Sequence, residues 1–87
     1  MIEITEVRIK KVETGRVKGI ATITINDCFV VNDIKIVNGE RGLFIAMPSR
    51  RVPSGEVKDI AHPINSETRE LIQSVVLAEY KDKNYSN

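Results

Sequence analysis

The fold is decided by residues 29–47, which read FVVNDIKIVNGERGLFIAM. Two apolar runs, rich in β-branched and aromatic residues, lie on either side of a polar segment at residues 38–42 that contains two glycines. Runs of this composition around a short glycine-containing turn are typical of a β-hairpin. The stretch therefore predicts two antiparallel strands, at about residues 29–37 and 43–47.

Two further strands are predicted on the N-terminal side of this hairpin, at about residues 2–13 and 17–25. Both are rich in isoleucine, valine and threonine, and the turn Thr14-Gly15-Arg16 between them offers a glycine for positive φ. The dipeptide Asn26-Asp27 then predicts a turn into residue 29. Together these patterns predict an antiparallel sheet of four to five strands.

The strands within residues 29–47 are apolar on both faces, although an antiparallel sheet normally leaves one face to water. Since one helix covers only part of one face, the second apolar face predicts a further covering surface, most simply a second copy of the chain. The sequence thus predicts a homodimer; the alternative is a sheet that curls on itself and closes its own core. For the longer strand the expected faces are Val30, Ile34 and Ile36 on one side and Phe29, Val31 and Val37 on the other.

Residues 66–82 have the spacing of an amphipathic helix. Ser66 is expected as its N-cap, with Glu67 and Glu70 in the first turn, where the helix dipole favours negative charge. Residues 83–87 carry no periodicity and are expected to fray. The chain is therefore predicted to be a single α+β domain over residues 1–87, with its β portion at about residues 1–62. The apolar stripe of the helix consists of Leu71, Ile72, Val75, Val76 and Tyr80.

The composition of the 87 residues argues against several classes of protein. No apolar run approaches the roughly 20 residues of a membrane-spanning helix, and the N-terminus lacks the pattern of a secretory signal. These patterns predict a cytoplasmic location and no membrane partner. The single cysteine, Cys28, agrees with this because a small secreted domain usually carries several paired cysteines, so no disulfide is expected, and Cys28 itself is expected to be a small buried hydrophobe. The formal net charge is only +1, but residues 34–58 carry five basic against two acidic side chains, whereas residues 59–87 carry three against five.

No catalytic constellation stands out in the sequence. His62 is the only histidine, and no second nucleophile, base or set of metal ligands lies at recognisable spacing from it. Its spacing from Asp59 allows a hydrogen-bonded pair, but a local structural role before Pro63 is favoured over acid–base catalysis. The glycines at positions 39, 42 and 55 do not form a phosphate-binding motif. We therefore expect no enzyme activity, no metal and no cofactor.

The segment that favours a binding function is residues 48–58, PSRRVPSGEVK. Its prolines and glycine predict an exposed loop, in which the adjacent Arg50 and Arg51 must point in different directions. Two guanidinium groups held on such a projection are suited to phosphate oxygens. The alternative is an ordinary solvated turn, or a salt bridge from this loop to the acidic start of the helix, and the residues alone do not decide between them.

Several segments resemble the signature of the stage V sporulation protein G (SpoVG) family. The resemblance is carried by residues 42–51, GLFIAMPSRR, together with residues 59–65, DIAHPIN. The segments FVVNDIK at 29–35, ITEVR at 4–8 and SETR at 66–69 are similar to the family as well. The resemblance covers nearly the whole chain and implies a small bacterial regulator with an antiparallel sheet, a C-terminal helix and a homodimeric assembly.

The same resemblance implies links to sporulation, septum formation and cell division, and several members of the family bind DNA or RNA. It implies that nucleic-acid contacts come from the basic loop and the helix start. This chain departs from the family at Asn32, where histidine is frequent, in the turn at residues 52–57, and in its short C-terminal tail. The site residues that the resemblance implies are Arg50, Arg51, Ser66, Thr68 and Arg69.

Two functions remain as hypotheses. The first is a homodimeric DNA- or RNA-binding regulator whose two basic loops and helix N-termini lie on one surface, with arginines on phosphates and polar side chains on base edges. The alternative is a protein-interaction module that acts on a septation or regulatory partner, through a sheet edge or the helix face, without nucleic-acid binding. The near-neutral total charge favours this alternative.

Overall fold

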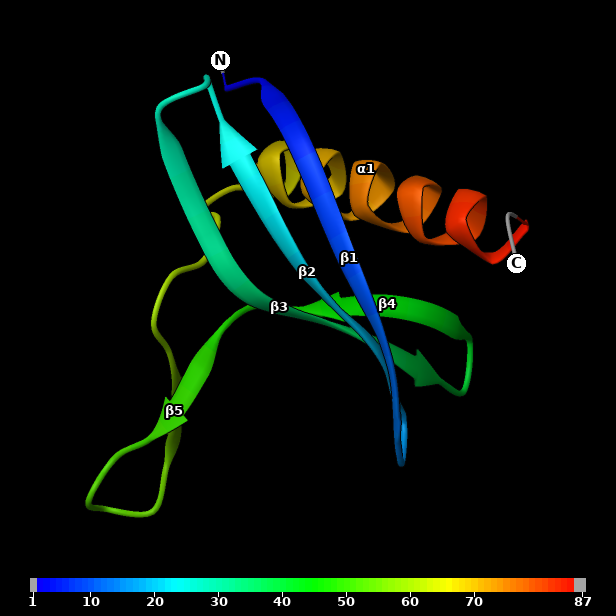
Figure 1. Cartoon of the computed structure of the whole chain (residues 1–87). Helices are drawn as coiled ribbons and strands as arrows, with labels where there is room; N and C mark the ends of the chain where they lie inside the picture. Colours follow the sequence, from blue (N-terminus) through cyan, green and yellow to red (C-terminus); the bar gives the residue numbers. More distant parts are fainter. Residues whose placement is uncertain (1, 86–87) are drawn as a thin grey trace.

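The computed structural model describes residues 2–85, and Figure 1 shows how the strands and the helix of that part are arranged. The elements are β1 (Ile4–Thr14), β2 (Val17–Ile25), β3 (Phe29–Gly39), β4 (Gly42–Ala46), β5 (Ser49–Arg51), β6 (Val57–Asp59) and α1 (Ser66–Tyr85). The first four strands form an antiparallel sheet in the order β1-β2-β3-β4, and β5 and β6 form a separate two-stranded sheet. The α+β class and the antiparallel sheet with a C-terminal helix are therefore confirmed.

Tight turns join the strands of the main sheet where the sequence predicted them. Gly15 adopts a φ of 60° between Thr14 and Val17, which lie opposite each other on β1 and β2. Asn26 and Asp27 have φ values of 51° and 55°, the left-handed pair that a tight hairpin turn requires. Because each turn is short, consecutive strands pair with each other, and β1 and β4 are left as the edges of an open sheet.

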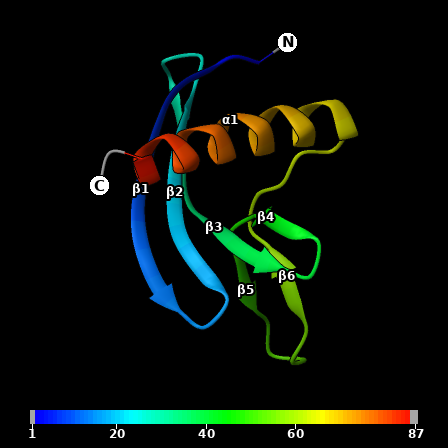
Figure 2. The same cartoon turned by 90° about the vertical axis from the view of Figure 1, so that its right-hand side faces the viewer.

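Helix α1 packs across one face of the main sheet, here called the inner face (Figures 1 and 2). Its buried side chains recur at every fourth residue, as in an amphipathic helix, and belong to the same core as the inner face of the sheet. Gln73 also ties the helix to β4, because its Oε1 accepts a hydrogen bond of 3.2 Å from the backbone N–H of Ile45. The buried core consists of Ala21, Ile23, Ile34, Ile36, Ile45, Met47, Ile72, Val76 and Tyr80.

A β-bulge in β3 corrects the expected faces of that strand. Ala21 and Ile23 are two residues apart in β2, but their partners in β3, Ile34 and Val31, are three apart. Asp33 accommodates the extra residue with a φ of 63°, a conformation that aspartate tolerates better than most residues. Val31 therefore lies on the inner face with Ile34, and the strict alternation assumed from the sequence is wrong across this point.

No helix within residues 2–85 packs on the opposite, outer face of the main sheet, and Pro48, Ser49 and Ile60 adjoin it beside Ile20 and Lys35. Because of the bulge, Val30 lies on this face, 53% exposed, and not beside Ile34 as predicted. Phe44 of β4 lies on the same face and is 42% exposed. The second apolar face is thus present, and the open sheet does not curl round to bury it.

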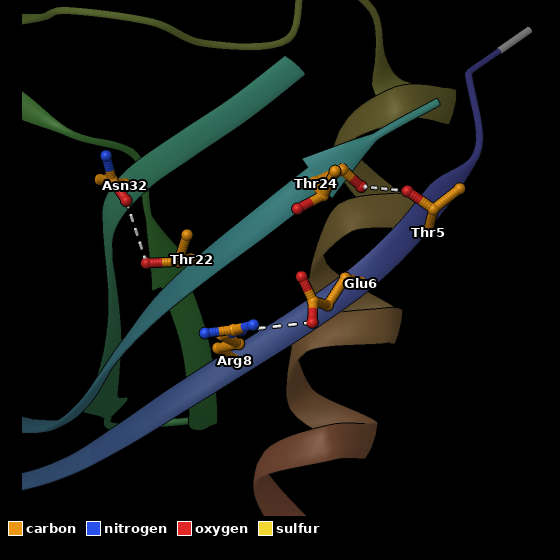
Figure 3. A network of polar contacts seen from close by, with 6 residues as sticks. All are labelled: Thr5, Glu6, Arg8, Thr22, Thr24 and Asn32. Carbon is orange, nitrogen blue, oxygen red and sulfur yellow. Dashed lines mark hydrogen bonds and ion pairs between the residues drawn. The ribbon is translucent and has the colours of Figure 1, made fainter. Parts of the chain in front are cut away.

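The part of the outer face that β1 and β2 contribute is more polar (Figure 3). Arg8 donates from Nε to Glu6 Oε2 at 3.2 Å, and Thr22 donates from Oγ1 to Asn32 Oδ1 at the same distance. The first contact runs along β1, and the second crosses from β2 to β3. The outer face is therefore polar on β1 and β2 and also at Asn32 and Lys35 of β3, and its large exposed apolar side chains, Val30 and Phe44, lie towards its two ends.

The start and end of α1 differ from the prediction. Asn65 is the N-cap, because its Oδ1 accepts a hydrogen bond of 2.8 Å from the backbone N–H of Thr68, and Ser66 is the first helical residue. Asparagine and serine both cap helices well, so the sequence alone could not decide which of these two adjacent residues is the N-cap. The helix continues to Tyr85 instead of ending near residue 82, and the last two residues of the expected frayed end lie outside the described residues. No helix in the described part has the length and apolar character needed to cross a membrane.

Cys28 is exposed, and its prediction as a small buried hydrophobe is therefore wrong. It directly follows the turn at Asn26 and Asp27, and its backbone N–H donates to the carbonyl of Ile25 at 3.0 Å. This position is at the tip of the β2–β3 hairpin, beyond the buried part of the sheet. A side chain at a hairpin tip remains exposed even when an apolar strand follows it.

Candidate nucleic-acid interface

Residues 48–60 form a β-hairpin, here called the arm, where the sequence predicted an exposed loop. The backbone N–H of Ile60 donates to the carbonyl of Pro48 at 2.7 Å, which closes the base of the arm. Near the tip, the backbone N–H of Val52 donates to the backbone carbonyl of Glu56 at 2.9 Å. Gly55 provides a φ of 92° in the turn. The arm extends away from the main sheet and from α1 (Figures 1 and 2). The segment thus extends from the molecule as expected, but it is a two-stranded hairpin and not an irregular loop.

The two arginines of the arm have different surroundings. Successive residues of a strand face opposite sides, so Arg50 and Arg51 lie on opposite faces of the arm, as predicted. Arg51 lies opposite Val57, and its Nη1 donates to the carbonyl of Gly55 at 3.1 Å, which stabilises the turn. Arg50 is exposed and makes no side-chain hydrogen bond or ion pair with any residue that the structure describes.

Arg50 lies directly opposite Lys58, so two cations form a cross-strand pair. Like charges in this position destabilise a hairpin, and an anion held between them would relieve the repulsion. The alternative in which the loop forms a salt bridge to the helix finds no support, because the single ion pair among the side chains described joins Arg8 to Glu6. The Arg50–Lys58 face of the arm is therefore an unneutralised cationic surface.

The helix start presents a less uniform group of side chains. Ser66 and Arg69 are exposed, but Glu67 and Glu70 lie within two residues of Arg69 and make this turn acidic. Thr68 is half-buried and lies one helical turn before Ile72, on the side that faces the sheet. Ser66 and Arg69 thus remain available to a ligand, whereas the side chain of Thr68 faces inward.

The side chain of Thr68 lines a cavity of about 210 Å³ between the helix start and the sheet. The walls are mostly apolar and include Phe29, Met47 and Pro63. A threonine at the wall of such a cavity is poorly placed to read the edge of a base that remains within a duplex. The cavity instead suits an apolar group.

The expected site residues fall into two separate groups. Arg50 and Arg51 lie on the arm, and Ser66, Thr68 and Arg69 lie in the first turn of α1, at the far end of residues 60–65. The helix start lies in the upper part of both cartoon views and the arm in the lower part (Figures 1 and 2). No hydrogen bond or ion pair between described residues joins the two groups. One chain therefore presents two surfaces, and not one continuous patch.

The sequence reasoning missed two cationic features. Lys58 was not among the expected site residues, although the turn at residues 53–55 could have indicated a hairpin that pairs it with Arg50. Arg16 and Arg41, from two different turns, line a groove of about 420 Å³ at one end of the main sheet. The basic residues in both turns are visible in the sequence, but only the register of the strands places them together.

His62 makes one polar side-chain contact among the residues that the structure describes. Its Nδ1 lies 3.1 Å from the carbonyl oxygen of Pro63, and no hydrogen bond joins it to Asp59. No three His, Cys, Asp or Glu side chains within the part of the chain that the structure covers are grouped so that they could hold a metal ion. The arrangement around His62 fits the local structural role before Pro63.

Comparison with known proteins gives an independent finding. A family model described as SpoVG matches residues 2–82. The chain is 56% identical to a protein of Caldicellulosiruptor bescii over 81 residues, which cover 92% of both chains. It is 59% identical to a protein of Agathobacter rectalis, over 92% of this chain and 93% of the relative, and 58% identical to one of Clostridium acetobutylicum, over 92% and 85%. Each of these relatives is named "Putative septation protein SpoVG".

Proposed function

The chain belongs to the SpoVG family, and on this premise we propose that it is a homodimeric DNA- or RNA-binding regulator linked to sporulation, septum formation and cell division. It acts by occupying its target and performs no catalysis. The observation that carries the proposal is the pair of unneutralised cations, Arg50 and Lys58, directly opposite each other on the exposed arm. Such a pair suits the phosphate backbone, whose charge supplies much of the affinity of nucleic-acid-binding proteins.

In this proposal the arm and the helix start have different roles. Arg50, Lys58 and Arg51 contact phosphate oxygens and contribute affinity that is independent of sequence. Ser66 and Arg69, which are exposed at the helix start, contact base edges and contribute sequence preference. Because the two surfaces are separate, a bound nucleic acid must extend along the molecule or bridge two copies of it.

A second copy of the chain is supported by the apolar residues that remain exposed. Val30 lies on the outer face of the main sheet, and Val57 and Ile60 are exposed on the arm. Large apolar side chains that remain exposed close together often mark a surface that a partner covers. A symmetric pair of chains would also double the number of arms, and with it the number of phosphate contacts.

The test is a salt titration of binding to duplex DNA, single-stranded DNA and RNA. Affinity for the true ligand should fall steeply as salt rises, and Arg50→Ala with Lys58→Ala should make this dependence shallower. Arg8→Ala with Lys81→Ala, which removes the same charge elsewhere, is the matched control and should leave the slope unchanged. Failure of the unaltered protein to show salt-dependent binding to any of the three would reject the proposal.

The cavity beside Thr68 favours a protein-interaction module as the second candidate. Ile64, in the segment that leads to the helix, is 90% exposed, and exposed Phe29 lines the cavity. An apolar anchor from a septation or regulatory partner would fit here, next to the acidic helix start. Ile64→Ser would then weaken capture of the partner and leave nucleic-acid binding unchanged, whereas the regulator proposal gives Ile64 no role.

A further inference from the structure

The turn end of the main sheet carries a groove that the proposed site does not include. This turn groove, with a volume of about 420 Å³, is lined by Arg16 of the β1–β2 turn and by residues 39–44 of the β3–β4 turn. The two turns are adjacent because the backbone N–H of Asn38 donates to the carbonyl of Arg16 at 2.8 Å. The groove is thus formed by segments that are more than twenty positions apart in the sequence.

The turn groove lies among segments that carry more basic than acidic side chains. Residues 10–18 and 37–44 together carry five basic side chains against two carboxylates, Glu13 and Glu40. None of these charges takes part in an ion pair with another described side chain. The basic side chains are Lys10, Lys11, Arg16, Lys18 and Arg41, of which Lys18 is half-buried and the others are exposed.

An aromatic ring forms part of the same groove. Phe44 lies against Gly39, where a Cβ atom would stand only 2.7 Å from its Cε1, so the ring occupies the space that a side chain at position 39 would need. The backbone of the turn thus supports the ring from one side. The remaining surface of Phe44 is exposed in the turn groove, close to Arg16 and Arg41, which line it as well.

We propose that the turn groove binds a segment of single-stranded nucleic acid, with Arg16 and Arg41 on phosphate oxygens and one unstacked base on the ring of Phe44. Proteins that hold single strands combine a cationic groove with an aromatic platform, because each exposed base offers a flat face to stack on. A duplex keeps its bases stacked inside and cannot use Phe44. The inference rests on the proposed nucleic-acid function and names a ligand class, single-stranded DNA or RNA, for a surface other than the arm.

The test compares binding of a fluorescein-labelled single-stranded DNA, the matching RNA and the duplex formed from that DNA. Arg16→Ala with Arg41→Ala should lower the salt-dependence slope for the single strand by up to about 1.4 per bound chain, from about 0.7 per lost phosphate contact. Arg16→Lys with Arg41→Lys keeps both charges and should retain most of the slope. Arg8→Ala with Lys81→Ala, the charge-matched control, should leave it unchanged.

Phe44→Leu tests the stacking contact and keeps an apolar side chain of similar size at the position. It should weaken single-strand binding about fivefold or more, as expected for the loss of one base–aromatic contact, and leave duplex binding unchanged. Phe29→Leu changes the other exposed phenylalanine, which lies outside the turn groove, and should alter neither. Circular dichroism and sedimentation establish that each variant keeps its fold and its assembly.

The possible outcomes separate this inference from the proposed function. Normal binding by both turn-groove variants, with weakened binding by Arg50→Ala, would overturn the inference and leave the regulator proposal standing. An equal loss for single strand and duplex in Phe44→Leu, or a loss of dimer mass in that variant with unchanged affinity, would assign Phe44 to another role and overturn it as well. No binding of any nucleic acid by the unaltered protein would reject both.

Discussion

Replacing the two arginines of the arm one at a time should separate ligand binding from stability. Arg50→Ala removes a cation that has only Lys58 opposite it, so it relieves a repulsive cross-strand pair worth about 0.2–1 kcal/mol. The free energy of unfolding should therefore stay the same or rise slightly. Each phosphate contact that Arg50 makes contributes about 0.9 to the salt-dependence slope for duplex DNA, so a dimer with two arms should lose about 1.8.

Arg51→Ala is the matched comparison from the neighbouring position. Arg51 donates to the carbonyl of Gly55, so its loss should destabilise the arm by about 0.5–1.5 kcal/mol, towards the lower end because the bond is exposed. The assay is a fluorescence anisotropy titration at several salt concentrations, together with a thermal unfolding curve for each variant. If Arg50→Ala lowered the thermal midpoint and left the slope at its normal value, the assignment of the arm to phosphate binding would be refuted.

The remaining predictions concern assembly, stability and sequence preference. Sedimentation at micromolar concentration should show twice the 9.8 kDa chain mass, and a monomer throughout that range would contradict the dimer. Asn65→Ala should lower the free energy of unfolding by about 0.5–2 kcal/mol in denaturant titration and Ser66→Ala by clearly less, whereas the reverse order would restore Ser66 as the cap. Ile34→Ala should cost about 2–5 kcal/mol in the same measurement, because its side chain is fully buried in the core; a cost below 1 kcal/mol would mean that the core is not packed as described. Exchanging Ser66 and Arg69, the exposed residues of the helix start, for those of another family member should change which sequence wins a competition assay, and an unchanged preference would place specificity elsewhere.

The main sheet could be predicted because its turns carry their own chemistry. Asn26 and Asp27 tolerate positive φ, and Gly15 adopts it without strain, so each turn marks where one strand ends and the next begins. The helix was predictable from its apolar spacing for the same reason, since the signal lies within a few neighbouring residues. Only its N-cap and its last residues were predicted wrongly. The N-cap was ambiguous because Asn65 and Ser66 are equally good candidates for it.

Features that depend on pairing between strands could not be predicted from local patterns. The bulge at Asp33 shifts the faces of β3, yet an aspartate within an apolar run gives no sign of its backbone conformation. The strands of the arm are only three residues each and lie close to prolines, so they lack an alternating pattern. The parts of the candidate site that depend on strand register were not predicted. Lys58 lies opposite Arg50 because β5 and β6 pair with each other, and Arg16 and Arg41 line one groove because two turns lie side by side at the end of the main sheet.

The hydrogen bond from the backbone of Ile45 to Gln73 bears on how the protein avoids aggregation. Strand β4 is an edge strand, and an edge with unpaired backbone groups invites a strand from another molecule to extend the sheet. The helix covers the apolar inner face, and its Gln73 also accepts the hydrogen bond from the N–H of Ile45. Detaching the helix would therefore expose an apolar surface and an unpaired sheet edge together. Cleavage or truncation within α1 should therefore lead to fibrils or precipitate, and not to a soluble, partly folded sheet. The helix thus protects the protein against aggregation through its sheet.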